Sequence, residues 1–100
     1  GFDIQGVPRP DGLRRYLSFE HPSGKYQIVQ YGGGKLSAKE TLLWFQENLL
    51  PMGWTILRTA PGDVQPYLFA NQGGAVLIVR TKAGCEGICL TINVAWGGGA

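Results

Sequence analysis

Residues 37–54 read SAKETLLWFQENLLPMGW, and this segment contains both the start and the stop signals of a helix. Serine followed three residues later by glutamate is a capping box, in which the serine hydroxyl accepts a helix-start N–H and the glutamate reaches back. Apolar side chains then recur at helical spacing on one face of the segment. The side chains of this stripe are Leu42, Phe45 and Leu49. Since Pro51 cannot continue a regular helix and Gly53 suits a left-handed cap, we predict one amphipathic helix over residues 38–50.

The segments on either side of this helix have the alternating pattern of strands. Two such segments precede it, joined by the turn sequence HPSG at residues 21–24. Four shorter apolar segments follow it, and turn sequences rich in Gly, Pro and Asn separate them. The expected strands are residues 13–20, 25–31, 54–59, 67–70, 75–82 and 88–96. The element order is therefore ββαββββ.

A single amphipathic helix can bury its apolar stripe only against one face of the sheet. We therefore predict an α+β two-layer sandwich, with one helix packed on a five- or six-stranded antiparallel sheet. The alternation along each strand assigns side chains to the core side. The predicted core is Leu17, Phe19, Leu42, Phe45, Leu49, Trp54, Ile56, Ile78, Leu90, Ile92 and Val94. The opposite face of the sheet is left without a covering layer.

Length and composition exclude several classes of protein. One hundred residues make a single domain, residues 1–100, with an extended lead-in at 1–12 and a flexible end at 97–100. The longest apolar run, residues 75–79, is far shorter than the roughly 20 residues that cross a bilayer, so no membrane span is expected. One His and two Cys exclude a zinc or iron–sulfur site made by this chain alone.

Aromatic rings on a sheet can stack the bases of a nucleic acid, so the strand residues were compared with those of nucleic-acid-binding domains. The aromatic and basic residues on the predicted strands are Tyr16, Tyr26, Tyr31, Tyr67, Phe69, Arg14, Arg58 and Arg80. However, the RNA-recognition sheet has the order βαββαβ, and its signature run is missing here. The net charge of +2 is also too small for a dedicated nucleic-acid surface. We therefore expect no nucleic-acid partner.

No group of side chains in the sequence points to catalysis. The single histidine, His21, lies in a predicted hairpin turn beside Glu20, and neighbours on a strand point to opposite faces. The carboxylates are scattered along the chain. We therefore predict no catalytic residue, no cofactor and no metal site.

The two cysteines, Cys85 and Cys89, have a spacing that fits neither the C-x2-C redox motif nor haem attachment. They could form a disulfide across a tight loop, act as a redox pair, or remain as thiols of a hairpin. Glu86, which lies between them, disfavours a reactive thiolate. The spacing alone does not decide the compartment.

Two regions are candidate binding sites. The first is the Gly32–Ser37 turn, where backbone amides at a helix start and a lysine would attract phosphate or carboxylate, although the Walker pattern is incomplete. Its anion-binding residues would be Gly33, Gly34, Lys35 and Ser37. The second is the uncovered sheet face, which suits a protein partner or self-association. Its candidate residues are Tyr16, Tyr26, Cys89, Thr91 and Asn93.

Residues 37–54 follow a proline-rich lead-in, Val7-Pro8-Arg9-Pro10. With its capping serine, its Trp44-Phe45 pair and its Gly53-Trp54 ending, this run resembles a group of small bacterial domains. In these domains a proline-rich opening precedes a hairpin, a helix ending in Gly-Trp and a β-meander. Many of them lie in secreted or lipid-anchored envelope proteins, so the resemblance implies a periplasmic or extracellular location. It brings no catalytic residues, and the lipobox cysteine of the anchored form is absent here.

The sequence thus predicts a non-enzymatic binding or protein-interaction module of the bacterial cell envelope. The alternative is a small ligand- or anion-binding domain, or an enzyme, that uses the Gly32–Ser37 turn.

Overall fold

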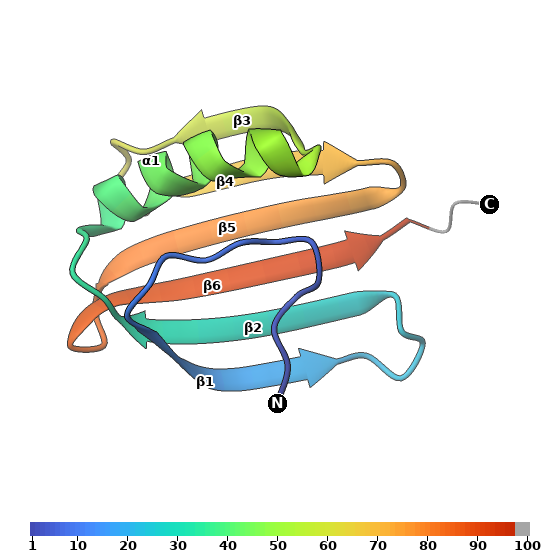
Figure 1. The fold of residues 1–100 in the computed structure, drawn as a ribbon, viewed down its shortest axis with the longest axis horizontal. Helices are drawn as coiled ribbons and strands as arrows, with labels where there is room; N and C mark the ends of the chain where they lie inside the picture. The colour runs from blue at the N-terminus through green and yellow to red at the C-terminus, as the bar shows by residue number, and fades with distance from the viewer. Residues whose placement is uncertain (98–100) are drawn as a thin grey trace.

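A computed structural model describes residues 1–97, and in it six strands form one antiparallel sheet with a helix across one face (Figure 1). The strand order across the sheet is β1-β2-β6-β5-β4-β3. The elements are β1 Leu13–Glu20, β2 Tyr26–Gly33, α1 Ala38–Leu49, the 3-10 turn Leu50–Met52, β3 Thr55–Ala60, β4 Tyr67–Gln72, β5 Ala75–Gly84 and β6 Gly87–Trp96. The predicted α+β class and the order ββαββββ are confirmed. The predicted flexible end falls largely on residues 98–100, which lie outside the described residues.

Helix α1 begins at the predicted capping box. The Ser37 hydroxyl accepts the Glu40 N–H at 3.1 Å, and the Glu40 carboxylate accepts the Ser37 N–H at 2.9 Å. After α1 and the 3-10 turn, Gly53 has a φ of 93° and donates its N–H to the Leu50 carbonyl at 3.0 Å. Because side chains with a Cβ rarely adopt this φ, glycine is the residue that suits the cap.

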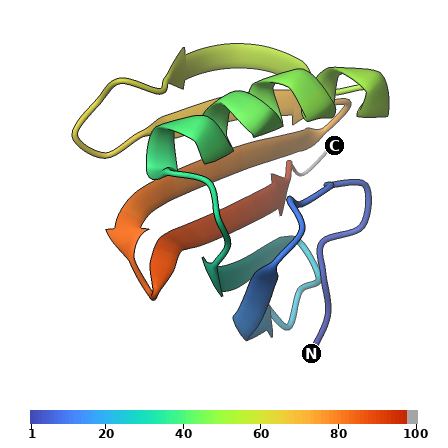
Figure 2. The same ribbon diagram turned by 60° about the vertical axis from the view of Figure 1, so that its left-hand side comes forward.

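Helix α1 covers only one half of the sheet, above β3, β4 and β5 (Figure 2). Its apolar stripe is fully buried there. Two side-chain hydrogen bonds fix it to the strands: Thr81 of β5 donates to the Ala38 carbonyl at 2.9 Å, and Thr59 of β3 donates to Gln46 at 3.1 Å. The half of this face above β6 and β2 therefore needs another cover.

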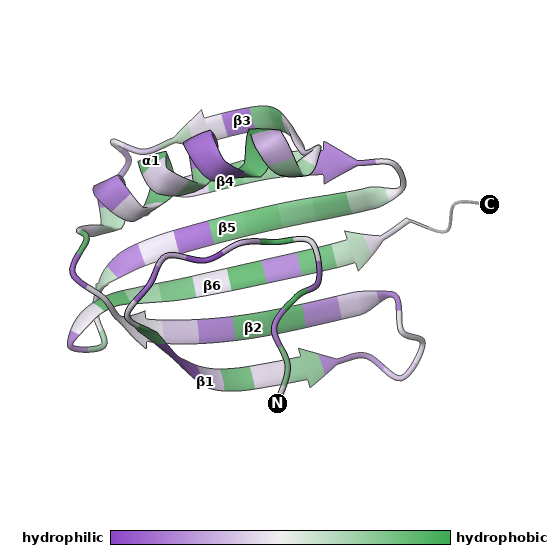
Figure 3. Cartoon of the chain, viewed as in Figure 1, coloured by the Kyte–Doolittle hydropathy of each residue, from purple (hydrophilic) through white to green (hydrophobic). Residues whose placement is uncertain are grey.

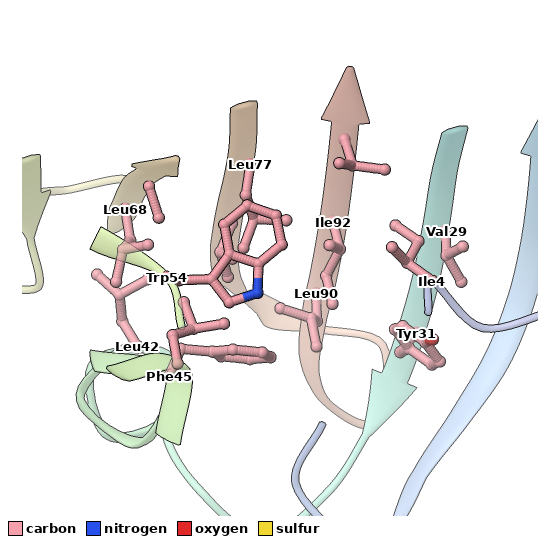
Figure 4. Packing of buried hydrophobic residues seen from close by; sticks show 14 of the residues in the cluster. Ile4, Val29, Tyr31, Leu42, Phe45, Trp54, Leu68, Leu77, Leu90 and Ile92 are labelled. Atoms are coloured by element: carbon pink, nitrogen blue, oxygen red, sulfur yellow. The ribbon is translucent and has the colours of Figure 1, made fainter. Parts of the chain in front are cut away.

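Residues 1–12 supply that cover without forming a helix or a strand (Figure 1). Ile4 is buried and points toward Val29 and Tyr31 of β2 (Figure 4). The indole N–H of Trp54 donates to the Gly6 carbonyl at 2.9 Å and joins this segment to the end of the helix. The predicted lead-in is thus part of the core, which the sequence did not indicate.

Asp3 holds the N-terminal segment to the sheet by polar contacts. Its carboxylate accepts the Tyr31 hydroxyl at 2.6 Å and forms an ion pair with Arg15 at 3.1 Å. The hydrogen bond from Tyr31 lowers the pKa of Asp3, Arg15 and Arg9 lower it further, and partial burial opposes them. Burial raises the pKa of Tyr31, and the hydrogen bond to Asp3 adds to that rise.

Acid should weaken this contact. The pKa of Asp3 is lower in the folded chain than its ordinary value of 3.8, so the ionised group stabilises the fold above that pH. This contribution is lost as the pH falls through the folded-state pKa. Because the Asp3 side chain is about half exposed and solvent screens its contacts, Asp3→Asn should lower the free energy of unfolding at pH 7 by less than about 1 kcal/mol. Urea unfolding at about pH 2 to 7 should show a flatter acid dependence for Asp3→Asn than for the unmodified chain, and an equal acid dependence of the two would contradict this role of Asp3.

The core lies between the sheet and the layer formed by α1 and residues 1–12, and the longest apolar stretch is on the central strand β5 (Figure 3). Seven predicted core residues are buried: Leu42, Phe45, Leu49, Trp54, Leu90, Ile92 and Val94. Ile56 is partly buried against them. Ile4, Val29, Tyr31, Leu68, Leu77, Val79 and Ile88 also belong to the core and were not predicted.

Three predicted core residues, Leu17, Phe19 and Ile78, lie on the opposite face of the sheet, so the prediction was wrong for them. Leu17 and Phe19 are 45% and 47% exposed. The register between β1 and β2 shifts at Tyr16, where one extra residue forms a bulge. Since strand side chains alternate, one inserted residue sends every later side chain of β1 to the other face. Ile78 pairs with Asn93, which faces away from α1.

Candidate binding face

The sheet face opposite α1, here called the open face, has no covering layer in residues 1–97. Its side chains follow from the strand register and alternate with the buried ones. They are Arg14, Tyr16, Leu17, Phe19, Tyr26, Ile28, Gln30, Gly32, Thr55, Arg58, Ala60, Tyr67, Phe69, Asn71, Val76, Ile78, Arg80, Lys82, Cys89, Thr91, Asn93 and Ala95. The structure therefore brings Tyr16, Tyr26, Cys89, Thr91 and Asn93 together on this face, while their role in binding stays a prediction.

The Tyr16 ring lies directly over Gly32 of the neighbouring strand. A Cβ at position 32 would collide with this ring and would come within 2.9 Å of Cys85. The glycine thus lets an exposed aromatic ring rest against the sheet backbone. Tyr31, which the sequence grouped with these aromatics, is instead buried on the α1 side.

Asn93 forms the polar centre of the open face and is only 8% exposed. Its amide donates to the Tyr26 hydroxyl at 2.5 Å, and its carbonyl oxygen accepts from the Arg80 guanidinium at 3.3 Å. With both ends of its amide engaged, Asn93 positions Tyr26 and Arg80 and has little surface of its own. The sequence identified Asn93 and Tyr26 but not their contact, because β2 and β6 are far apart along the chain.

A groove of about 580 Å³ crosses β2, β6, β5 and β4 on this face. Its lining includes Gln30, Thr91, Ile78, Arg80, Lys82, Tyr67 and Phe69. The Tyr67 and Phe69 rings are 5.2 Å apart, and the Arg58 guanidinium is 5.9 Å from the Tyr67 ring. A groove of this size with an apolar floor and several polar groups that converge on it is typical of a binding site.

The charged side chains of the open face are all cationic: Arg14, Arg58, Arg80 and Lys82. Among the described residues, ion pairs join only Asp3 to Arg9 and Arg15, so none of these four cations is paired. The carboxylates lie elsewhere: Asp3 and Asp11 in the N-terminal segment, Glu20 beside Gln27 on the α1 side, Glu40 and Glu47 on α1, and Asp63 and Glu86 in turns. The open face thus carries an uncompensated positive charge.

Large apolar side chains are exposed on the open face outside the groove. Tyr16, Leu17 and Phe19 of β1 and Val76 of β5 belong to this group. The alternating pattern of β1 predicted that Leu17 and Phe19 lie in the core, so they were not predicted as surface residues. The bulge at Tyr16 that moves them has no clear signal in the sequence.

The Gly32–Ser37 turn has a structural reason for its glycines. Gly33 and Gly34 have φ values of 96° and 77°, and the backbone of Gly87 in the β5–β6 hairpin packs against their carbonyls. A Cβ on Gly87 would lie 2.9 Å from the Gly34 carbonyl oxygen and still closer to that of Gly33. Positive φ therefore accounts for Gly33 and Gly34, and close backbone contact accounts for Gly87.

The chain's own carboxylate occupies the start of α1, where an anion would bind. The Glu40 carboxylate accepts the Ser37 N–H, and this hydrogen bond is the main cause that lowers the pKa of Glu40. A smaller contribution in the same direction comes from the Ser37 hydroxyl. A hollow of about 260 Å³ beside the helix start is lined by Glu40 and Glu47 and by three apolar residues. Both features repel a second anion. Anion binding by Gly33, Gly34, Lys35 and Ser37 remains an untested prediction, and this geometry does not favour it.

Cys85 and Cys89 form a disulfide, with Cα atoms 5.3 Å apart. It spans the turn between β5 and β6, where Cys85 and Glu86 have φ values of 53° and 58°. Two successive residues with positive φ make a type I′ hairpin turn, which neither cysteine nor glutamate favours. Of the three interpretations that the spacing left open, the structure supports the disulfide, which holds this turn closed.

No protein-family model, curated protein or solved structure matches this chain. The resemblance to bacterial envelope domains therefore stays a prediction. No helix within residues 1–97 has the length and apolar character needed to cross a bilayer. In the same range, no three His, Cys, Asp or Glu side chains lie close enough together to hold a metal ion. The open face is therefore the feature from which we infer a function.

Proposed function

We propose that this chain is a non-enzymatic binding module that recognises a protein partner through its open face. The observation that carries the proposal is the difference between the two faces of the sheet. Helix α1 and residues 1–12 cover one face completely enough to bury its apolar side chains. The other face exposes leucine, phenylalanine and valine around a groove. Contiguous exposed apolar surface is typical of a site that contacts a partner.

The size of this surface favours a macromolecular partner over a small ligand. Leu17, Phe19 and Val76 lie outside the groove, so a molecule that filled only the groove would leave them exposed. The mixture of aromatic rings, arginines and aliphatic side chains also resembles the composition of protein–protein interfaces. A partner that covers the whole face would bury both groups at once.

A second copy of this chain fits the open face poorly. Two open faces in contact would bring Arg80 and Lys82 of one copy toward the same unpaired cations of the other. Edge-to-edge pairing is also hindered, because both edge strands, β1 and β3, carry a register shift. We therefore propose a partner that is a different protein.

The proposed location is the bacterial cell envelope, either periplasmic or extracellular. The Cys85–Cys89 disulfide supports an oxidising compartment, since such bonds are rare in the reducing cytosol. The resemblance of residues 37–54 to envelope domains points the same way.

Site-specific photo-crosslinking tests the proposal. A benzophenone amino acid replaces Phe19 on the open face, and a matched chain carries it at Leu43, an exposed residue on the outer side of α1. After irradiation in the source cells, we expect a discrete protein adduct from position 19 and none from position 43. With the recovered partner purified, Phe19→Ser should weaken binding at least about tenfold. Adducts from position 43 alone, or equal adducts from both, would overturn the proposal.

A further inference from the structure

The distribution of charge on the open face carries a more specific inference, which rests on the proposed function. We propose that the open face recognises an acidic segment of its partner, with carboxylates that reach Arg80 and Lys82 and apolar side chains that cover the adjoining patch. The unpaired cations in the groove would bind the carboxylates of this segment, and the exposed apolar residues beside the groove would contact its apolar side chains.

The first step is that these cations lack partners within the chain. Lys82 makes no ion pair or side-chain hydrogen bond within residues 1–97, and the only side-chain partner of Arg80 there is the neutral amide of Asn93. Asn93 is itself fixed by Tyr26, so this hydrogen bond orients the otherwise exposed Arg80 guanidinium. An oriented and unpaired charge favours a ligand of opposite sign.

The second step is the order of these groups along the strands. Lys82 pairs with Cys89 near the β5–β6 hairpin, and Arg80 pairs with Thr91 one step further along the same face. Beyond them, the row that contains Ile78, Ile28 and Phe19 is apolar from β1 to β4 except for Asn93, and it ends in Arg58 on the edge strand β3. Along β5, and along β1 at the opposite edge, the open face therefore changes from cationic to apolar in the strand direction. A segment with acidic residues at one end and apolar residues at the other matches this order.

The third step is that Arg80 and Lys82 line the groove and do not project from a flat surface. Low-dielectric walls strengthen the potential of a charge and screen it less than free solvent does. Ile78 and Phe69 supply such walls beside them. Carboxylates that enter the groove therefore meet a stronger attraction than they would at an isolated surface lysine.

A single-stranded nucleic acid fits these observations less well than an acidic protein segment. The Arg58 guanidinium already lies over the Tyr67 ring, and the aliphatic Leu17 and Val76 offer no stacking surface. The net charge of the chain is only +2. A nucleic-acid ligand is nevertheless an explicit outcome of the test.

The test measures binding of labelled polymers to the full chain by fluorescence anisotropy. The probes are a random copolymer of glutamate and tyrosine, polyglutamate, and single-stranded oligodeoxythymidylate. We expect the copolymer to bind most tightly, because it offers both carboxylates and rings. Raising the ionic strength from about 0.01 M to about 0.1 M shortens the Debye length from about 30 Å to about 10 Å and should weaken this binding.

Charge-matched variants locate the binding site. Arg80→Gln with Lys82→Gln should weaken copolymer binding about tenfold, since it removes two ion pairs. Lys35→Gln with Lys39→Gln removes the same charge near the start of α1 and should change binding less than about twofold. Lys82→Gln alone breaks no contact within the described chain, so it should give about a threefold loss without any effect on folding.

Three results of the binding assay would overturn the inference: no copolymer binding at low ionic strength, equal losses in the two double variants, or tighter binding of the oligonucleotide. Each of these results would refute the acidic segment only, because the protein-binding function is tested separately by the crosslinked adducts at position 19. An adduct at position 19 on a protein surface without carboxylates would likewise refute the acidic segment while supporting the module.

Discussion

Replacing Phe45 by alanine is expected to lower the free energy of unfolding by about 3–5 kcal/mol, whereas Phe19→Ala should lower it by less than about 1 kcal/mol. The Phe45 ring is fully buried between α1 and the sheet and contacts Trp44 edge-on, with ring centroids 5.1 Å apart. Its removal would leave a cavity in the core. Phe19 is about half exposed on the open face, so its removal costs much less buried area.

Urea unfolding of both variants measures this difference, and the matched side chains make the comparison direct. If Phe19→Ala cost as much as Phe45→Ala, the apolar residues of the open face would serve the stability of the fold. The proposal of a binding face would then lose its main observation. A small effect of Phe19→Ala would leave binding as the reason for an exposed phenylalanine.

Deletion of residues 1–8 is expected to lower the free energy of unfolding by about 2–5 kcal/mol. The deletion exposes the α1-side surfaces of Val29 and Tyr31 that Ile4 covers. It also removes the carbonyl that accepts the Trp54 indole N–H, and it removes the carboxylate that accepts the Tyr31 hydroxyl. A buried donor that loses its partner is destabilising beyond the lost apolar contact.

Two substitutions at position 4 provide a graded control for the deletion. Ile4→Val should cost about 0.5–1.5 kcal/mol, and Ile4→Ala should cost more than Ile4→Val but less than the deletion. An unchanged free energy of unfolding after the deletion would contradict the assignment of residues 1–12 to the core. Such a result would mean that the cover of residues 1–12 over β2 and β6 contributes nothing to stability.

The parts of the fold that could be predicted from the sequence are those with local signals. The capping box at Ser37 and Glu40 and the left-handed glycine at Gly53 fixed the helix, since both act within a few residues. Alternation on β6 correctly placed Leu90, Ile92 and Val94 in the core. Short turns predict the pairing of β1 with β2 and of each strand from β3 to β6 with the next, but they give no signal for the pairing of β2 with β6.

The bulge at Tyr16 and the packing of residues 1–12 could not be predicted in this way. A bulge depends on how β1 fits β2, and the sequence of β1 alternates equally well without it. As a result, Leu17 and Phe19 were assigned to the wrong face. Ile4 is a single apolar residue among turn-forming ones, so no periodicity marks it as buried.

The candidate binding face could be predicted only in part. Cys89, Thr91 and Asn93 were found because they alternate with buried residues on β6. Arg80 and Lys82 show the same alternation on β5, where the buried residues Val79 and Thr81 precede each of them. The sequence of β5 could therefore have placed both cations on the open face. Their convergence with residues of β2 and β4 into one groove depends on the strand order, which the sequence does not reveal.

Amide chemical-shift mapping of the isotope-labelled full chain, titrated with the copolymer of glutamate and tyrosine, locates the surface that binds acidic and aromatic side chains. We expect the largest shifts at Arg80, Lys82 and Thr91, which lie around the groove of the open face, and little change along α1. Shifts concentrated at Lys35 and Lys39, near the start of α1, would contradict this expectation.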